Sequence, residues 1–435
     1  MLKKLNIEKI IYVIILLVMV LIPLLKLSTY IPTIEEFYTN VFEIKRVYVL
    51  WGSIFLLLIT YIYLILSGKE KVRYVDIIIF ILIILAFLST GYAVDFMKAF
   101  FGEDYRYEGL LTILSYYLLI LNAKSIKQEK YKRNIIKLFI SIGVFQSIYA
   151  LLQSNTLLPY IRRHSSRYMA MGLCGNPNFF GSYMVMQSLL VGYIYIYRSK
   201  KRYLLLYILF SVTLYLAEST GPVLSALCAL IFSIFVIPKK WKKILLLILL
   251  MLLSFGFASK SLKYIQTNKF KTYIHEDWEI VEEISSITEK PKEQIGNGRL
   301  LLWKNSLPLV REYWLIGCGL DNFQNVYPNS GYVKYDKAHN VYLQISVTNG
   351  VPALILFLIL LFLAFIKGIK CKNSFIFPIY MAFIGYSIQA FLNISVIDVA
   401  PYYYIILGLI FSEKVDKGKI RNKKRKSQET SVEDI

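Results

Sequence analysis

Apolar runs of about 20 residues recur along almost the whole chain, and a helix needs this length to cross a hydrocarbon core about 30 Å thick. The composition agrees, because 57% of the 435 residues are hydrophobic and 18% are charged. Soluble domains carry about 45–50% apolar and about 25% charged residues, and membrane β-barrels have short alternating strands. The sequence therefore predicts an all-α fold: a polytopic transmembrane helical bundle of about 12 spans with one large extracytoplasmic loop.

The predicted spans divide the chain into four parts. Residues 1–259 hold the first nine transmembrane helices, residues 260–340 form the large extracytoplasmic loop, residues 341–412 hold the last three helices, and residues 413–435 form a basic cytoplasmic tail. The predicted spans are Ile10–Leu27, Val47–Ser67, Val75–Val94, Gly109–Ala123, Ile135–Gln153, Asn178–Tyr197, Tyr203–Ala217, Thr220–Ile237, Lys243–Ser259, Val341–Ile369, Phe375–Ser395 and Val399–Phe411.

Basic residues indicate the orientation, because cytoplasmic loops carry an excess of Lys and Arg. They cluster in one set of short loops and in the tail, at residues 69–73, 124–133, 198–202, 239–243, 367–372 and 414–426. We therefore predict a multi-pass protein of the cytoplasmic (inner or plasma) membrane with both termini in the cytoplasm. The net charge of +22 is explained mostly by such residues and the anionic lipid headgroups that they meet, so no nucleic-acid partner is predicted.

The end of the large loop, residues 296–352, is rich in aromatic residues and polar at defined positions. Arg299 and Trp303 are spaced to share one helical face, and His339-Asn340 stands directly before the next span. A lone loop histidine is more often structural. The chain holds only three histidines, however, and the place of His339 favours a base whose ordinary pKa, about 6.5, suits proton abstraction.

Two further outer loops carry cations. Arg106 lies between two tyrosines just before a span, which is typical of a snorkelling side chain in an aromatic belt and equally of a cation aimed at a lipid-linked phosphate. Arg162, Arg163 and Arg167 stand with His164 on the predicted outer side, against the positive-inside trend. They indicate anion binding, because guanidinium groups match phosphate oxygens with two hydrogen bonds.

The step Asn176-Pro177-Asn178 precedes another span. Asparagine is a favoured N-cap and proline a favoured first helical residue, so a helix is predicted to begin here. This explains Asn176 and Pro177 and leaves Asn178 as a candidate for substrate binding.

Several catalytic motifs are absent. The chain has no GxxxxGK[ST] loop, no GxSxG elbow, no HExxH and no Asp-x-Asp pair, so neither a cofactor nor a metal site is predicted. The spans also do not show the buried charged residues expected of an ion-coupled transporter.

Five short motifs, all on the predicted outer side, resemble the bacterial O-antigen ligase family, which includes Wzy-type polysaccharide polymerases. They occur in family order and are RYEGLLT (Arg106–Thr112), GNPNFFG (Gly175–Gly181), Arg299-x-x-x-Trp303, GCGLDNF (Gly317–Phe323) and His339-Asn340-x9-Gly350. The resemblance covers most of the chain from about residue 90 to 410. Where the family often has Ser-Arg-Gly, this chain has Ser219-Thr220-Gly221. Arg106 or the cluster at residues 162–167 would have to supply that cation.

The resemblance implies an inverting, metal-independent transfer of a glycan from an undecaprenyl-diphosphate-linked donor to a glycan, lipid or protein acceptor. It assigns catalysis to His339 and Arg299. Residues expected to bind substrate are Arg106, Arg162, Arg163, Arg167, Asn178, Trp303 and Asn340.

A glycolipid flippase or exporter without catalytic chemistry is the alternative. A water-filled path through the spans would favour export, and a groove open to the outer leaflet near His339 would favour transfer. The sequence leaves open ligase against polymerase, lipopolysaccharide against capsule, the sugar, the acceptor, the oligomeric state, and whether Cys174 and Cys318 are bridged.

Overall fold

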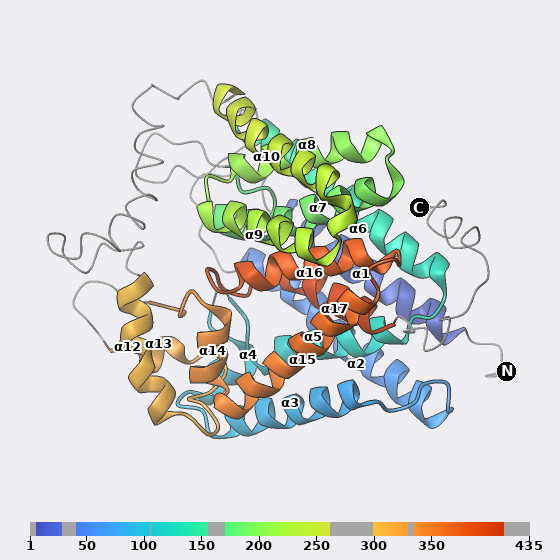
Figure 1. Cartoon of the computed structure of the whole chain (residues 1–435). Helices are drawn as coiled ribbons and strands as arrows, with labels where there is room; N and C mark the ends of the chain where they lie inside the picture. Colours follow the sequence, from blue (N-terminus) through green and yellow to red (C-terminus); the bar gives the residue numbers. More distant parts are fainter. Residues whose placement is uncertain are drawn as a thin grey trace, which may run out of the picture.

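A computed structural model describes residues 6–27, 41–104, 106–154, 170–261, 299–328 and 335–412 of the chain. Within these ranges the regular structure is entirely helical (Figure 1). The helices are α1 (Ile7–Leu27), α2 (Val41–Leu66), α3 (Tyr74–Gly91), α4 (Phe96–Phe101), α5 (Leu110–Ser125), α6 (Glu129–Ser154), α7 (Pro177–Arg198), α8 (Lys201–Leu216), α9 (Thr220–Val236), η3 (Pro238–Lys240), α10 (Trp241–Ser261), α12 (Arg299–Glu312), α13 (Phe323–Val326), α14 (Val341–Thr348), α15 (Val351–Lys370), α16 (Ile376–Gln389) and α17 (Ala400–Ser412).

Every predicted span overlaps one of these helices. By length and composition, seven helices of the described part can cross a membrane, namely α1, α2, α3, α6, α7, α10 and α15. Shorter apolar helices are α5, α9, α16 and α17. The structure therefore confirms an all-helical, multi-pass type of membrane protein, while the number of twelve spans and the division of the chain into four parts stay predictions.

The helices fall into an inner and an outer set, which differ in how much of their apolar surface is exposed. Nearly all of α7 and α17 is buried. In contrast, Ile84 of α3, Leu253 of α10 and Phe362 of α15 are each more than half exposed. Large apolar surfaces of this kind mark a contact with lipid or with another protein, so α3, α10 and α15 present the faces expected to meet a bilayer.

The predicted tenth span, Val341–Ile369, is wrong as a single helix. The chain breaks at Gly350, whose φ is 87°, and α15 begins one residue later with Pro352 in its first turn. A β-carbon on Gly350 would lie 2.5 Å from the carbonyl oxygen of Leu315. The sequence does carry a sign of this break, because Thr348-Asn349-Gly350 interrupts the apolar run and Pro352 follows, and Asn-Gly and Pro are turn and helix-boundary signals.

Gly317 holds the same junction from the other side. Its φ is 84°, and a β-carbon there would lie 2.3 Å from the backbone carbonyl of Thr348. We expect Gly317→Ala to lower the free energy of unfolding by at least about 1–2 kcal/mol, because a left-handed backbone alone has that cost for a residue with a β-carbon. Thermal unfolding in detergent measures the loss. Gly52→Ala in α2 is the control, because nothing lies within 4 Å of that position, and an equal loss there would contradict the steric account.

The predicted helix start at Asn176-Pro177 is confirmed. Asn176 is the N-cap of α7, its side chain accepts a hydrogen bond from the backbone N–H of Asn178, and Pro177 is the first helical residue.

The expectation that the spans hold no buried charge is wrong at one end of the bundle. Asp76 in the first turn of α3 and Lys124 in the last turn of α5 are both fully buried and form an ion pair. The hydroxyl of Tyr61 also donates to Asp76 at 2.7 Å. The two charges neutralise each other, and the contacts of Asp76 link α3 to α5 and α2.

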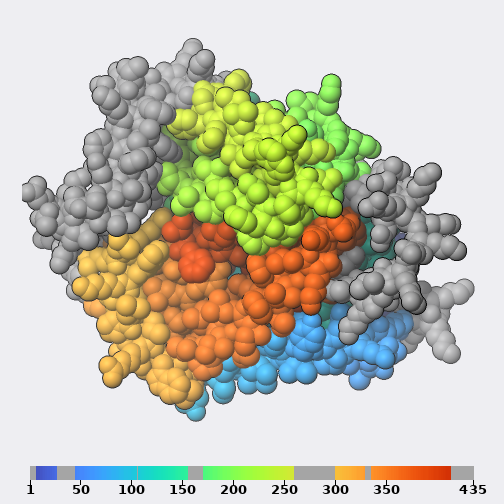
Figure 2. Space-filling view, in the orientation of Figure 1, coloured from blue at the N-terminus to red at the C-terminus, as the bar shows by residue number. Residues whose placement is uncertain are grey.

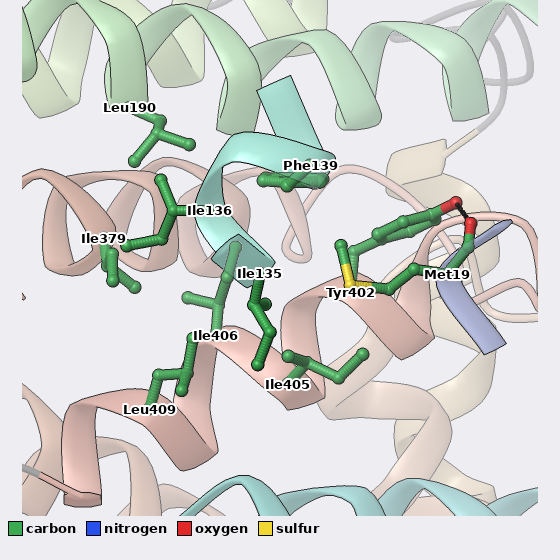
Figure 3. A pocket seen from close by; sticks show the side chains of 10 residues that line it. All are labelled: Met19, Ile135, Ile136, Phe139, Leu190, Ile379, Tyr402, Ile405, Ile406 and Leu409. Atoms are coloured by element: carbon green, nitrogen blue, oxygen red, sulfur yellow. Dashed lines mark hydrogen bonds between the residues drawn. The ribbon is translucent and has the colours of Figure 1, made fainter. Parts of the chain in front are cut away.

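A small cavity lies among α1, α6, α7, α16 and α17 (Figure 3). Its volume is about 10 Å³, which is the space of about one water molecule. The lining is apolar apart from the hydroxyl of Tyr402, which donates to the carbonyl of Met19 at 2.7 Å. This cavity is therefore too small and too apolar to be a path for a glycan.

Candidate functional site

Helices α12, α13 and α14 gather at one end of the molecule, beside α4 (Figure 1). The surface from α12 to α15 forms a continuous area next to that of α3 (Figure 2). Two contacts fix this end: Val94 donates its backbone N–H to the carbonyl of Cys318 at 3.0 Å, and Ser89 Oγ donates to the carbonyl of Thr348 at 2.6 Å. The 18 residues of α3 extend over about 27 Å, so this end lies far from the Asp76–Lys124 pair.

The turn Gly317–Phe323 is fastened to the loop after α3 by one asparagine. Asn322 Oδ1 accepts from the backbone N–H of Asp95 at 2.9 Å, and its Nδ2 donates to the carbonyl of the same residue at 3.0 Å. A buried amide that satisfies both backbone groups of another residue fixes two loops in one register. This explains why an asparagine stands in the GCGLDNF motif.

Residues 335–340, which we call the His339 segment, directly precede α14 in the chain. The indole N–H of Trp303 donates to the carbonyl of Ala338 at 3.0 Å, and Gln344 Oε1 accepts from the N–H of Ala338 at 2.8 Å. Asn340 is the N-cap of α14, and its side chain accepts from two backbone N–H groups. Trp303 and Asn340 therefore have structural roles that account for their presence, and their predicted substrate contacts stay predictions.

A buried ion cluster anchors this segment to the loop before α5. Lys337 Nζ lies 2.5 Å from Asp321 and 3.3 Å from Glu108, and all three side chains are at most 6% exposed. Burial acts to lower the pKa of Lys337, but the carboxylates of Asp321 and Glu108 outweigh it and raise the pKa. Lys337 is thus charged at neutral pH. The sequence reasoning missed these residues, although Glu108, Asp321 and Lys337 all stand within or beside the five motifs.

Arg106 makes a second, more exposed ion pair. Its Nε and one terminal nitrogen both contact Asp336 Oδ2, at 2.8 and 2.7 Å. Its guanidinium also lies 5.6 Å from the centre of the Phe179 ring, in the first turn of α7. Burial raises the pKa of Asp336, but the charge and hydrogen bonds of Arg106 outweigh this and lower the pKa. Arg106 therefore lies beside the His339 segment, and its contact with a lipid-linked phosphate stays a prediction.

His339 differs from its neighbours in having no such partner. Its backbone is left-handed, with φ of 50°, and its Nδ1 is buried without a hydrogen-bond partner in the described part of the chain. Burial lowers the pKa of His339, and the positive charges of Arg299 and Arg106 lower it further, against the opposing charge of Asp336. The imidazole is therefore neutral at pH 7 and able to accept a proton. Strained, unpartnered groups of this kind cluster at functional sites.

The remaining predicted residues divide into two groups. Arg299 begins α12 and acts electrostatically on His339. Asn178 Oδ1 accepts a hydrogen bond from the hydroxyl of Ser219 at 2.6 Å, so Asn178 links the start of α7 to the start of α9. The next residue, Phe179, is the one whose ring lies near the guanidinium of Arg106. Outside the described residues lie Arg162, Arg163 and Arg167. Cys174 and Cys318 are both buried and free.

The fold and site together define a multi-pass membrane protein with a neutral histidine among guanidinium groups. Residues 205–358 match the family model described as O-antigen ligase. This range includes Arg299, the Gly317–Phe323 turn and His339, so the resemblance seen in the motifs is confirmed there. A search of curated proteins finds no significant match. The family match and the apolar helices support a membrane glycan ligase or polymerase.

Proposed function

We propose that the protein is an integral-membrane glycosyltransferase that moves a glycan from an undecaprenyl-diphosphate carrier to an acceptor hydroxyl. The reaction takes place at the outer face of the cytoplasmic membrane, in surface polysaccharide biosynthesis. The observation that carries the proposal is the His339 segment. Five of its six residues have fixed partners, and within this segment only His339 holds a buried nitrogen, Nδ1, for which the described part of the chain supplies no hydrogen-bond partner.

The proposed chemistry needs one base. The acceptor oxygen forms a bond to the anomeric carbon, and the bond from that carbon to the diphosphate oxygen breaks. The hydroxyl proton passes to the neutral imidazole of His339, while the electron pair leaves with undecaprenyl diphosphate. Attack on the face opposite the leaving group inverts the anomeric configuration.

The leaving diphosphate needs positive charge as its own negative charge develops. Arg299 and Arg106 supply guanidinium groups beside His339 without a metal ion. Arg106 lies over Phe179, whose neighbour Asn178 binds Ser219. Arg106 is thus well placed to supply the cation that the family often carries next to that serine.

The same geometry supports the proposed orientation. The Lys69–Arg73 turn precedes α3, and the site lies at the other end of that helix. A basic turn is expected in the cytoplasm, and this supports the proposed position of His339 on the outer side, where the surface polymer would be assembled. The export alternative needs a continuous polar path through the helices.

Arg299→Lys tests the cation requirement. The variant keeps the charge but loses the planar, two-pronged match to phosphate, so we expect most transfer to be lost, with lipid-linked donor accumulating in cells and surface polymer shortened or absent by mass analysis. Arg311→Lys, at the exposed end of the same helix, is the matched control and should behave as wild type. Restoration of the Arg299→Lys variant by a divalent metal would instead indicate a metal-held diphosphate.

A further inference from the structure

The two ion pairs at the site differ in how easily they can be exchanged. Lys337, Glu108 and Asp321 are almost completely buried, so separating them would leave uncompensated charge in an apolar environment. Arg106 and Asp336 are 26% and 33% exposed, and ion pairs that reach solvent contribute little net stability. An incoming anion can therefore replace Asp336 as the partner of Arg106. It cannot replace the two carboxylates that bind Lys337.

A diphosphate is a stronger partner for Arg106 than a single carboxylate, because it carries more charge and can accept two parallel hydrogen bonds from the guanidinium. The Nε and one terminal nitrogen of Arg106 both contact the same oxygen, Oδ2, of Asp336. If these two nitrogens bind the diphosphate instead, Asp336 Oδ2 loses its contacts with Arg106.

The charged groups around Asp336 and His339 determine which group the freed carboxylate can stabilise. Lys337 is held by Asp321 and Glu108. Arg299 faces His339 from α12 and Arg106 faces it from the loop before α5, and both disfavour protonation of the imidazole. Among the described groups that act on the imidazole, Asp336, three residues before His339 on the same segment, is the one that favours protonation.

We propose that the Arg106–Asp336 ion pair is an exchangeable contact that senses the donor: a diphosphate that binds Arg106 frees Asp336, and the freed carboxylate stabilises the proton that His339 accepts. Asp336 is then a positioning residue, and the base gains strength only when the leaving group is in place. The reaction step itself rests on the proposed function, but the ion-pair exchange does not.

The test measures the pKa of His339 and does not need turnover. In a chain with His164→Gln and His275→Gln, His339 is the single histidine, and NMR of ring-labelled histidine reports its titration directly. On addition of inorganic pyrophosphate we expect the pKa of His339 to rise by about one pH unit or more, as an opposite charge at close range produces. In the Asp336→Asn chain the rise should be clearly smaller, and Asp336→Glu should restore part of it.

Asp104→Asn is the matched control, because Asp104 is exposed in the same loop as Arg106 and its loss removes the same charge. It should leave the response as in the parent chain. An equal rise with and without Asp336, or no rise at saturating pyrophosphate, would overturn the exchange. If the response is present but His339→Ala still transfers glycan, the exchange stands and the proposed catalytic role fails.

Discussion

Replacing His339 with alanine should lower glycan transfer by about 10²–10⁴-fold, the usual effect of losing a general base. Expression and thermal stability should stay near the wild-type values, because the side chain is only half-buried and its Nδ1 makes no hydrogen bond within the described residues. The lipid-linked donor should still bind and should accumulate in cells, since the arginines are intact. Purified protein with lipid-linked donor and acceptor gives the rate.

His339→Gln distinguishes a base from a structural residue. Glutamine keeps a hydrogen-bonding group but cannot take the proton, so it should fail as badly as alanine. The wild-type kcat/KM should also fall as the pH drops through the lowered pKa of His339 in the free protein, since only the neutral form accepts a proton. Near-normal turnover by the glutamine variant would mean that His339 positions other groups and that the base lies elsewhere.

The largest effect on stability is expected at Lys337. Lys337→Met keeps an apolar stem of similar length but leaves Glu108 and Asp321 buried without their cation. Removing one partner of such a buried pair costs about 3–5 kcal/mol. The backbone N–H groups that donate to Asp321 and the hydroxyl of Tyr116 that donates to Glu108 remain, so the loss should fall toward the lower end of that range.

Thermal unfolding in detergent measures this loss, with Lys98→Met as control. Lys98 pairs with Glu103 in the same part of the site, but both side chains are about one-quarter to one-third exposed, and exposed pairs contribute about 0–1 kcal/mol. Equal losses of unfolding free energy in the two variants would contradict the claim that the buried ion pairs of Lys337 contribute more to stability than the exposed pair of Lys98.

The parts of the molecule that follow from local sequence were predictable. Continuous apolar runs located the helices, and Asn176-Pro177 located the start of α7, because helix starts depend on residues that are neighbours in the chain. The spacing of Arg299 and Trp303 placed both on α12. The break at Gly350 was missed although Asn349-Gly350 and Pro352 mark it in the sequence. The close approach of Leu315 at that point is the part that no local pattern reveals.

The site itself was predictable only in its members and not in its connections. Arg106 meets Asp336 across a separation of 230 residues, and Lys337 meets Glu108 across 229. Motif order indicated that these stretches share one face of the membrane. It did not indicate that Asp336 and Lys337, which lie close to His339 in the sequence, form separate ion pairs, one partly exposed and one buried.

The same limit applies to the roles assigned to single residues. Asn340 was expected to bind substrate, yet its side chain caps α14, and Trp303 holds the Ala338 carbonyl. A polar residue in a short motif can be retained for the backbone geometry of the site as well as for its ligand.

Transfer by purified protein in liposomes, with a lipid-linked glycan donor inside the membrane and an acceptor outside, tests the central claim most directly. The proposed function predicts acceptor-dependent formation of a new glycosidic bond together with an equal amount of undecaprenyl diphosphate, and loss of both products with His339→Gln. Movement of intact donor across the bilayer, with no new bond and no dependence on His339, would contradict it and establish export.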